Sequence, residues 1–332
     1  MISFKEFRDK LEVKIRNSEQ VFIVPHIGAD LDSIASSIAM SYIVRKLGKD
    51  VYIILDEDPL KIEPGVKMII DEARNNISII TLDKYKKMSS NNDLLITCDV
   101  NKTHLVCCKN ELDKFKEKVV IDHHNEDMNT IETDTILILP EKSSASEIMC
   151  ELLRQFQIKV DSFLANYLLA GIYLDTNKFT KNASCNTMKI VASLVGKGAD
   201  IVKVNRYFEE DFYSDRRVQD LISKSEFYSY TVALCVGGAK MRYLKEELAK
   251  AADYLLRYRN VDASFAVGYT EDDVISISAR SKGDINVGDI MKELEGGGHL
   301  TSAATRLVGQ DLDQTVKSLK KVYKPKFSLE NK

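Results

Sequence analysis

Two adjacent histidines, His123 and His124, follow Asp122 directly after the apolar run 118–121, in a chain that has five histidines in all. Imidazole and carboxylate groups bind metal ions and transfer protons, and open α/β sheets bind their ligands at the carboxyl ends of strands. If this run is a strand, the triplet lies at its carboxyl end, where such a sheet binds its ligands. We therefore predict that Asp122, His123 and His124 are catalytic.

Three further groups of polar residues follow apolar runs in the same way: the segment 26–32, Asp99 and Asp175. Together with His123 they supply two imidazoles and four carboxylates. Hard oxygen and nitrogen donors of this kind suit Mn²⁺ or Mg²⁺ and are a poor match for a thiolate zinc site. The predicted metal ligands are His26, Asp30, Asp32, Asp99, His123 and Asp175.

Six ligands are more than one catalytic ion requires, so we expect two ions that share Asp99. Two ions about 3.5–4 Å apart activate water and stabilise both the entering and the leaving oxygen when a phosphate ester is cleaved. Taken singly, Asp30 or Asp99 could equally be a helix cap or a turn residue, but the joint pattern favours metal binding. His123 and His124 should point different ways from a strand end, so we expect one to bind metal and the other to orient or protonate substrate.

Short apolar runs alternate with amphipathic segments in the first half of the chain, which is typical of βαβ units around a largely parallel sheet. Asp32 can cap one helix, and Ser144 with Glu147 forms a capping box at the start of another. A third helix ends at Asp175. Strands are predicted at 20–25, 50–55, 93–98, 118–122 and 135–139.

The second half of the chain indicates a helical stretch followed by a smaller domain. The predicted fold is thus α/β, with a mainly parallel sheet flanked by helices and a second, smaller α+β domain. The predicted limits are 1–205 for the metal-binding domain, 206–229 for a helical linker and 230–325 for the second domain. Strands are predicted at 228–236, 262–269 and 273–280, and helices at 186–225, 240–258, 286–295 and 312–323, with a further short helical stretch after His299.

Two features of the second domain favour phosphate binding. The glycine run 296–298 lets backbone N–H groups approach a phosphate closely, and His299 adds a donor. Arg280, next to Ser281 at a predicted strand end, offers a planar guanidinium that can grip phosphate. The alternatives are a helix C-cap for the glycines and a surface ion pair for Arg280. The predicted substrate contacts are Arg280, Ser281, Gly297, Gly298 and His299, with the active site in a cleft between the two domains.

The composition is that of a soluble globular protein: 332 residues, 44% apolar and 29% charged, enough for two ordinary domains. A net charge of -3 and a pI near 6.1 argue against a general affinity for long nucleic acid, which needs a basic surface. Six cysteines without a Cys-x-x-Cys pair fit a reducing cytoplasm. Since no run approaches the roughly 20 apolar residues that span a bilayer, we expect no membrane segment in this chain.

These motifs resemble the DHH phosphoesterase family, whose two-domain members join a DHH domain to a DHH-associated domain. The resemblance runs from about residue 21 to residue 322 and keeps the family's order of motifs. It implies that the six predicted ligands bind two manganese ions, with Mg²⁺ or Co²⁺ as substitutes. It also implies that His124, Arg280, Ser281 and the glycine–histidine loop face the substrate phosphates. The motifs are His26-x3-Asp30-x-Asp32, Asp99, Asp122-His123-His124, Asp175-Thr176 and 296–299.

Within this family, the stretches 177–180, 198–212 and 277–287 are most similar to the catalytic module of GdpP-type cyclic di-AMP phosphodiesterases. The implied reaction is hydrolysis of cyclic di-AMP to linear pApA by water that two metal ions activate. The implied partners are small cyclic or short linear adenine dinucleotides and a second copy of the chain in a homodimer. The alternative is a nanoRNA or pApA oligoribonuclease, or a pAp phosphatase, of the NrnA type. A binding protein without catalysis is less consistent with four clustered carboxylates, whose repulsion a metal must neutralise.

Overall fold

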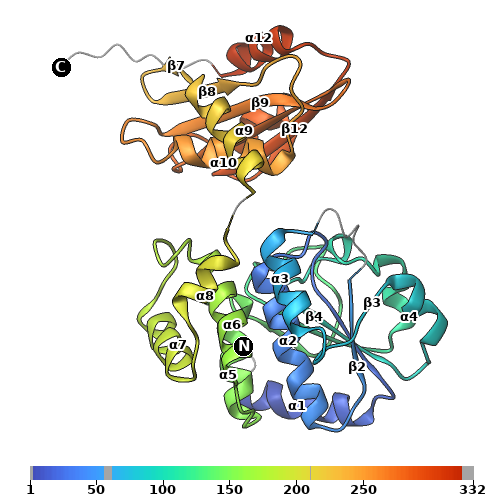
Figure 1. Cartoon of the computed structure of the whole chain (residues 1–332). Helices are drawn as coiled ribbons and strands as arrows, with labels where there is room; N and C mark the ends of the chain where they lie inside the picture. The colour runs from blue at the N-terminus through green and yellow to red at the C-terminus, as the bar shows by residue number, and fades with distance from the viewer. Residues whose placement is uncertain (1–2, 56–61, 210, 324–332) are drawn as a thin grey trace. The chain divides into compact units, whose positions relative to one another are not determined.

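The computed structural model describes residues 3–55, 62–209 and 211–323, and within these ranges no helix has the length and apolar character needed to cross a membrane. The chain divides into two compact units, residues 1–209 and 210–332 (Figure 1). The first unit has a parallel sheet flanked by helices and the second a mixed sheet with helices, which confirms the predicted fold class. The predicted domain limits stay predictions. Residue 210 of the predicted linker and residues 324 and 325 of the predicted second domain lie outside the described residues.

Parallel strands form the sheet of the first unit. They are β1 Val21–Val24, β2 Val51–Ile54, β3 Ile79–Ile80, β4 Leu94–Cys98, β5 Glu117–Asp122 and β6 Ile136–Ile138. Their spatial order is β3-β2-β1-β4-β5-β6, which runs outward in both directions from the pair of β1 and β4, as in doubly wound folds. The central strands β1 and β4 are continuous apolar runs, because helices cover both faces of the sheet.

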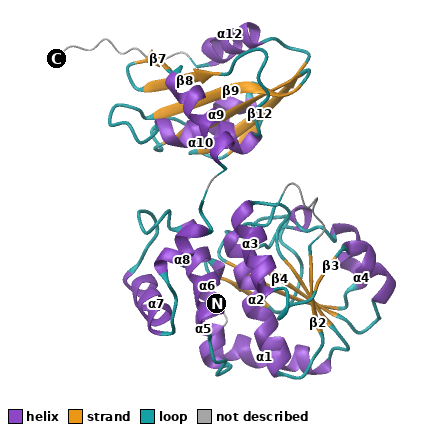
Figure 2. Cartoon of the chain, viewed as in Figure 1, coloured by secondary structure: helices purple, strands orange, loops and turns teal. Residues whose placement is uncertain are grey.

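The helices of the first unit enclose two hydrophobic cores, one on each face of the sheet (Figure 2). They are α1 Phe4–Asn17, α2 Leu31–Lys46, α3 Pro64–Ala73, α4 Leu82–Met88, α5 Ala145–Gln155, α6 Ser162–Asp175, α7 Cys185–Gly196 and α8 Ile201–Arg206. The larger core lies between the sheet and α1, α2, α3, α5 and α6. On the other face, Tyr85 of α4 packs with Phe22 and Phe115, and the three rings contact one another. The sheet is therefore a rigid frame for the loops at its edges.

Side-chain caps start the helices that carry the site. Asp30, not Asp32 as predicted, caps α2, because its Oδ1 accepts hydrogen bonds from the N–H groups of Asp32 at 3.0 Å and Ser33 at 2.9 Å. Ser144 caps α5 as predicted, by accepting from the N–H group of Glu147 at 3.0 Å. The predicted capping box is not completed, because the carboxylate of Glu147 accepts from Ser143 instead of from the N–H group of Ser144. Each cap satisfies N–H groups that have no partner within the helix. The carboxylate of Asp32 is thus left for another role.

The second unit is a mixed sheet with helices on both faces. Its elements are β7 Glu226–Ser229, β8 Val232–Val236, β9 Ala263–Glu271, β10 Val274–Ser281, β11 Gly297–Gly298, β12 Ser302–Val308, α9 Phe212–Ser223, α10 Lys245–Leu255, α11 Val287–Lys292 and α12 Leu312–Val322. The strand order is β11-β12-β10-β9-β8-β7, and β8 and β9 are parallel, whereas the other neighbours are antiparallel. Helices α9 and α10 pack on one face, and α11 and α12 on the other.

Several element predictions are corrected by the structure. The short helix expected after His299 is wrong, because strand β12 follows the glycine run. Its residues alternate between buried and exposed positions, as a half-buried strand requires. The predicted strand 228–236 is the hairpin of β7 and β8, and the predicted helix 186–225 is three helices, α7, α8 and α9. The two-residue strands β3 and β11 were not predicted.

Candidate metal centre

The predicted site residues of the first unit come together at the carboxyl edge of its sheet. Strands β1 and β4 are neighbours where the strand order reverses, and β5 lies next to β4. In doubly wound folds this switch point leaves a crevice in which ligands bind. The segment after β1 carries His26 and Asp30, Asp99 follows β4 directly, and β5 ends in Asp122. Three loops that are distant in the sequence therefore contribute to one site.

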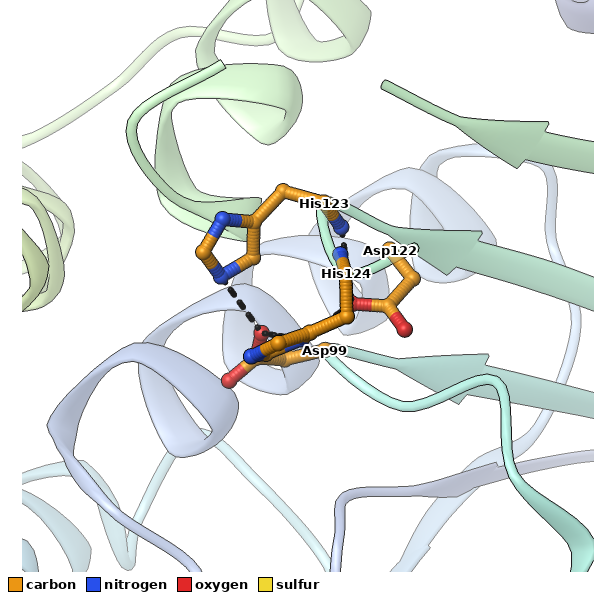
Figure 3. Close-up of side chains that lie close together, drawn as sticks. All are labelled: Asp99, Asp122, His123 and His124. Carbon is orange, nitrogen blue, oxygen red and sulfur yellow. Dashed lines mark hydrogen bonds and ion pairs between the residues drawn. The ribbon is translucent and has the colours of Figure 1, made fainter. Parts of the chain in front are cut away.

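Asp99 lies at the centre of this site (Figure 3). Its side chain is 2% exposed, and its oxygens lie 3.3 Å from Nε2 of His123, 3.7 Å from Nε2 of His26 and 3.7 Å from Nδ1 of His124. Its backbone has a φ of 61°, in the left-handed region that few residues other than glycine adopt. Backbone outliers of this kind cluster at functional sites. A buried carboxylate in contact with three histidines is thus more than a turn residue.

His26 and Asp30 form the part of the site that follows β1. Nε2 of His26 lies 3.5 Å from Oδ2 of Asp30, while Oδ1 of the same carboxylate caps α2. The backbone of His26 pairs with Val106 in an isolated antiparallel bridge. Both ends of this short segment are therefore fixed by the fold, which holds the two side chains beside Asp99.

Asp32 is fully buried, and the N-terminus of α5 holds its carboxylate. The N–H groups of Ala145 and Ser146 donate to Oδ2 at 2.7 Å and to Oδ1 at 2.8 Å. The partial positive charge at a helix N-terminus stabilises an anion there. Gly171 of α6 makes room for this arrangement, because a Cβ atom at this position would lie 2.5 Å from Oδ1 of Asp32. The contact was not predicted, although the capping box expected at 144–147 marked the helix start that makes it.

Asp175 ends α6, and its Oδ2 lies 3.1 Å from Nε2 of His123. The chain then turns through three consecutive non-glycine residues with left-handed backbone, 177–179, which is an unfavourable conformation. The ammonium of Lys178 lies 5.8 Å from the ring centre of Tyr173, within the range of a cation–π interaction. This contact helps to hold the turn and so fixes the end of the helix at Asp175.

Asp122 organises the histidine pair. Its Oδ1 accepts hydrogen bonds from the N–H groups of His123 at 2.7 Å and His124 at 3.1 Å, and it contacts Nδ1 of His124 at 2.8 Å (Figure 3). The two rings lie 4.3 Å apart, and both approach Asp99. Their exposure differs, since the side chain of His123 is 15% exposed and that of His124 is 59% exposed. His123 therefore faces the buried carboxylates, and His124 is accessible to a ligand.

These residues form three overlapping groups of potential metal ligands, and within each group the ligand atoms lie within 4.8 Å of one another. All six predicted metal ligands belong to these groups. Asp99 and His123 are each shared by two groups, which fits the expectation of more than one ion. The groups are Asp99, Asp122, His123 and His124; His26, Asp30 and Asp99; and Asp32, His123 and Asp175.

Some atoms at the centre of this cluster are buried and have no hydrogen-bond partner among the described residues: Oδ1 of Asp99, Nε2 of His123 and Oδ2 of Asp175. Buried polar groups are normally hydrogen-bonded. Unsatisfied oxygen and imidazole nitrogen atoms that face one another fit a hard divalent cation such as Mn²⁺ or Mg²⁺. The cluster could therefore hold metal, with the six predicted residues as candidate ligands.

The charge balance of the cluster favours the same interpretation. Burial and the charges of Asp99 and Asp175 raise the pKa of Asp32 well above its usual range. Burial also raises the pKa of Asp99 to about 7, although the adjacent imidazole of His123 lowers it. Burial alone would lower the pKa of His123, but the adjacent carboxylates of Asp175 and Asp99 raise it to about 11. The imidazole thus acts as a counter-charge for the carboxylates, a role that a bound cation would take over.

In the second unit, three of the five predicted substrate contacts line one cavity of about 560 Å³: Arg280, Gly297 and Gly298. Nε of Arg280 lies 3.2 Å from the carboxylate of Asp253. Arg280 therefore forms an ion pair, as the alternative prediction had it, and it also lines the cavity. The structure brings the guanidinium and the glycine run together, as phosphate binding would require.

The other two predicted substrate contacts lie elsewhere. Ser281 is buried, and its hydroxyl donates to the carbonyl of Leu300 at 3.0 Å. His299 is exposed, and its N–H group donates to the carbonyl of Ser302 at 2.8 Å. In the described part of the chain, neither residue is among those that line the cavity. Their role in substrate binding and the cleft between the domains stay predictions.

The fold and the cluster together define a two-unit α/β protein with a candidate metal centre at the switch point of a doubly wound sheet. The chain matches the family model for the DHH family, N-terminal domain, over residues 20–172, and the model for the DHHA1 domain over residues 229–324. The chain therefore belongs to the DHH family, which confirms the resemblance that its motifs indicated.

Proteins that are similar to this chain include two curated enzymes. It is 33% identical over 315 residues to the cyclic-di-AMP phosphodiesterase GdpP of Bacillus subtilis, a match that covers 92% of this chain and 48% of that protein. It is 23% identical over 301 residues to the bifunctional oligoribonuclease and PAP phosphatase NrnA of Thermus thermophilus, covering 89% and 86%. The chain thus spans about half the length of GdpP. A solved structure of an exopolyphosphatase-related protein from Bacteroides fragilis shares the fold, with a TM-score of 0.80, 22% identity and 97% of both chains covered.

Proposed function

We propose that this chain is a manganese-dependent phosphodiesterase that hydrolyses cyclic di-AMP to linear pApA. The convergence of the six candidate ligands around Asp99 and His123 carries this proposal, and the similarity to GdpP over most of the chain supports the substrate. The reaction adds water across one P–O3′ bond of the ring. The hydroxyl stays on phosphorus and the proton goes to O3′, so the product has one 5′-phosphate.

The residues of the cluster would divide the work between metal binding and proton transfer. Bound manganese ions would activate water and stabilise charge on the reacting oxygens. Asp122 accepts the Nδ1–H of His124 and so directs the other ring nitrogen away from itself. This hydrogen bond outweighs burial and raises the pKa of His124, so that the imidazolium can donate a proton to the leaving O3′. Two Mn²⁺ ions would be held by His26, Asp30, Asp32, Asp99, His123 and Asp175.

The second unit would bind the nucleotide. Arg280, Gly297 and Gly298 line the cavity that would receive a phosphate, and His299 follows the two glycines directly in the chain. Ser281 would support this loop through its hydrogen bond with the carbonyl that follows His299. We therefore propose Arg280, Gly297, Gly298 and His299 as substrate contacts and Ser281 as a positioning residue.

Hydrolysis of short linear substrates is the alternative function, and the similarity to NrnA over 86% of that protein favours it. The same metal cluster would serve an oligoribonuclease that cleaves nanoRNA or pApA, or a phosphatase that acts on pAp. These substrates differ from cyclic di-AMP in having free ends.

A side-by-side assay tests the proposed function. The purified chain is incubated with Mn²⁺ and equal concentrations of cyclic di-AMP, pApA or pAp, and the products are identified by chromatography. We expect cyclic di-AMP to be opened fastest, and we expect Asp122→Ala and His123→Ala to abolish turnover. Faster hydrolysis of the linear substrates would favour the alternative, and turnover that persists after chelation would contradict the metal-dependent mechanism.

We also propose that the chain is a cytoplasmic homodimer. None of the six cysteines, which all lie in the described residues, forms a disulfide, which is typical of proteins in a reducing compartment. Light scattering of the purified chain measures its mass in solution, and cell fractionation locates it. A monomer at assay concentrations would contradict the dimer.

A further inference from the structure

The cavity of the second unit extends beyond the proposed phosphate contacts. Its volume of about 560 Å³ is in the range of small-molecule binding sites. The glycine run and Arg280 form one part of its lining, while Lys245, at the start of α10, and Arg306, on β12, form another. One phosphate at the glycine run would leave these two cationic side chains without a function.

The two arginines lie at opposite ends of a strip of small side chains. Alternate residues of a strand share a face, and on this face of β10 and β12 the residues between the arginines are serine and alanine. Arg306 is opposite Ser276, which lies four positions before Arg280 in β10. The backbones of the two arginines are therefore about 13 Å apart along the strands. The facing pairs are Ser276 with Arg306, Ser278 with Ala304 and Arg280 with Ser302. The strip is therefore long enough for a ligand with two separated anionic groups.

Both arginines are held by carboxylates and yet keep donors for a ligand. Arg306 contacts Glu271 through Nη2 at 3.1 and 3.2 Å. Arg280 contacts Asp253 through Nε at 3.2 Å, and its Nη1 donates to the hydroxyl of Ser278 at 3.2 Å and to its neighbour's carbonyl at 3.0 Å, which leaves Nη2 for a ligand. A guanidinium has five N–H donors in a planar fork, so each side chain retains donors that could bind phosphate. Lys245 is exposed and adds a third positive charge to a lining that also includes the exposed Glu246.

Gly297 leaves open space inside this cavity. A Cβ atom at Gly296 would lie 2.5 Å from Cβ of Thr305, and one at Gly298 would lie 2.5 Å from Cβ of Ala303, so these two glycines allow β11 to approach β12. A Cβ atom at Gly297 would have no described atom within 4 Å, and its backbone is not left-handed. Neither packing nor conformation therefore requires glycine at 297, whereas a bound ligand would.

We propose that Lys245 and Arg306 bind a second phosphate, so that the cavity holds one nucleoside with a phosphate group on each side. The nucleoside would lie over the serine and alanine strip, between the glycine run and Arg306. Cyclic di-AMP, pApA and pAp all contain this unit, whereas AMP has a single phosphate. The second subsite would therefore favour these nucleotides over AMP. This inference rests on the proposed function, because it takes the ligand to be an adenine nucleotide.

Binding without hydrolysis tests the second subsite. In EDTA, the full chain is titrated calorimetrically with pAp and with AMP. The unaltered chain should bind pAp more tightly than AMP. Arg306→Ala and Lys245→Ala should each weaken pAp binding by about tenfold, the effect of one charge-assisted contact, and leave AMP binding unchanged. Arg306→Lys keeps the positive charge, so it should weaken pAp binding less than Arg306→Ala does.

Arg242→Ala is the matched control. It removes an exposed arginine of the same unit that pairs with Asp272 at 3.2 Å and is outside the cavity lining, so pAp binding should be unaltered. No binding of pAp, equal losses for pAp and AMP, or an equal loss in the control would overturn the second subsite. Since turnover is not measured, these outcomes leave the proposed hydrolysis intact. A chain that discriminates as expected but fails to open cyclic di-AMP would contradict the proposed function alone.

Discussion

Asp99 is the residue on which the candidate centre depends most. Asparagine keeps the size of the side chain and tolerates the left-handed backbone, but Asp99→Asn removes a charged ligand that two groups share. Mutation of a residue that only hydrogen-bonds to a metal ligand already lowers metal affinity or activity by about 10–100-fold. We therefore expect kcat for cyclic di-AMP, measured in Mn²⁺, to fall by more than about 100-fold.

The stability of this variant should not follow its activity. In EDTA, the buried carboxylates of Asp32 and Asp99 and the partly buried carboxylate of Asp175 repel one another, and the substitution relieves part of that repulsion. The free energy of unfolding of Asp99→Asn, measured with urea in EDTA, should equal or exceed that of the unaltered chain. A strongly destabilised variant would show that Asp99 serves the fold rather than the metal.

Gly171 is required by the position of Asp32. A Cβ atom at Gly171 would lie 2.5 Å from Oδ1 and 2.9 Å from Cα of Asp32, so Gly171→Ala must displace that carboxylate or α6. Overpacking typically costs about 1–3 kcal/mol, and we expect kcat to fall as well. Thermal unfolding and steady-state kinetics measure the two effects.

Gly196→Ala is the matched control for this substitution. Gly196 ends α7, its Cβ position is open and its backbone is not left-handed, so alanine there should stabilise the chain by about 0.4–1 kcal/mol and leave kcat unchanged. If the two variants behave alike, contact with Asp32 is not the reason for glycine at 171.

At the scale of elements, the first turn of α5 connects stability with the site. Glu147 is 1% exposed and accepts hydrogen bonds from Ser143 at 2.7 Å, Thr187 at 2.9 Å and Asn186 at 3.0 Å. Burial opposes its ionisation, but these hydrogen bonds hold the pKa of Glu147 below its usual range. The N–H groups of the same turn bind Asp32. The carboxylate thus anchors the helix end that holds a candidate ligand.

Glu147→Gln should lower the free energy of unfolding by about 1–3 kcal/mol at pH 7, because buried donors lose their charged acceptor. A carboxylate whose pKa is depressed by folding stabilises the protein above its unfolded pKa, about 4.3. That contribution is lost as the pH falls through the folded value, so the difference between the chains should shrink below about pH 4. Urea unfolding across this pH range measures it.

The control on the same helix is Glu151→Gln. Glu151 pairs with Arg154 near the surface at 2.5 Å, and such pairs contribute about 0–1 kcal/mol. The free energy of unfolding of Glu151→Gln should therefore be only slightly lower than that of the unaltered chain at every pH. A loss as large as that of Glu147→Gln would mean that any acidic residue of α5 has the same effect.

Elements with a strong burial pattern could be predicted from the sequence. Strands β1, β4 and β5 contain apolar runs, and the candidate ligands come at or shortly after their ends, so both the strands and these ligands were predicted. Strand β12 was mistaken for a helix because alanine at 303 provides a weak hydrophobic signal and favours helices. The apolar side of β10 also contains position 281, so period-two alternation could have placed Ser281 on the buried face.

The arrangement within the site was less predictable than its members. Asp30 and Asp32 are both suitable helix caps, and the sequence offers no local signal that distinguishes the cap from the buried carboxylate. The contact of Asp32 with Ala145 joins residues 113 positions apart. Contacts of this kind depend on how α2, α5 and α6 pack together, which local patterns do not determine.

At the scale of the whole molecule, metal should stabilise the two units unequally, because each has its own hydrophobic cores. An ion that binds only the folded form adds about 2.7 kcal/mol at a hundred times its Kd. We expect scanning calorimetry to show that Mn²⁺ raises the midpoint of the first unit's transition and leaves the second unit's unchanged. Asp99→Asn should lose this shift. An equal shift of both transitions would place the ion elsewhere.

The candidate ligands extend from position 26 to position 175 and join strand ends with the last turn of α6. In an unfolded chain, side chains so far apart meet seldom, because closing long loops costs entropy. A cation can therefore collect its full set of ligands only after the domain has nearly assembled. Manganese should then leave the refolding rate almost unchanged and slow the unfolding rate, which stopped-flow measurements would resolve. The centre would thus determine how long the native state lasts rather than how fast it forms.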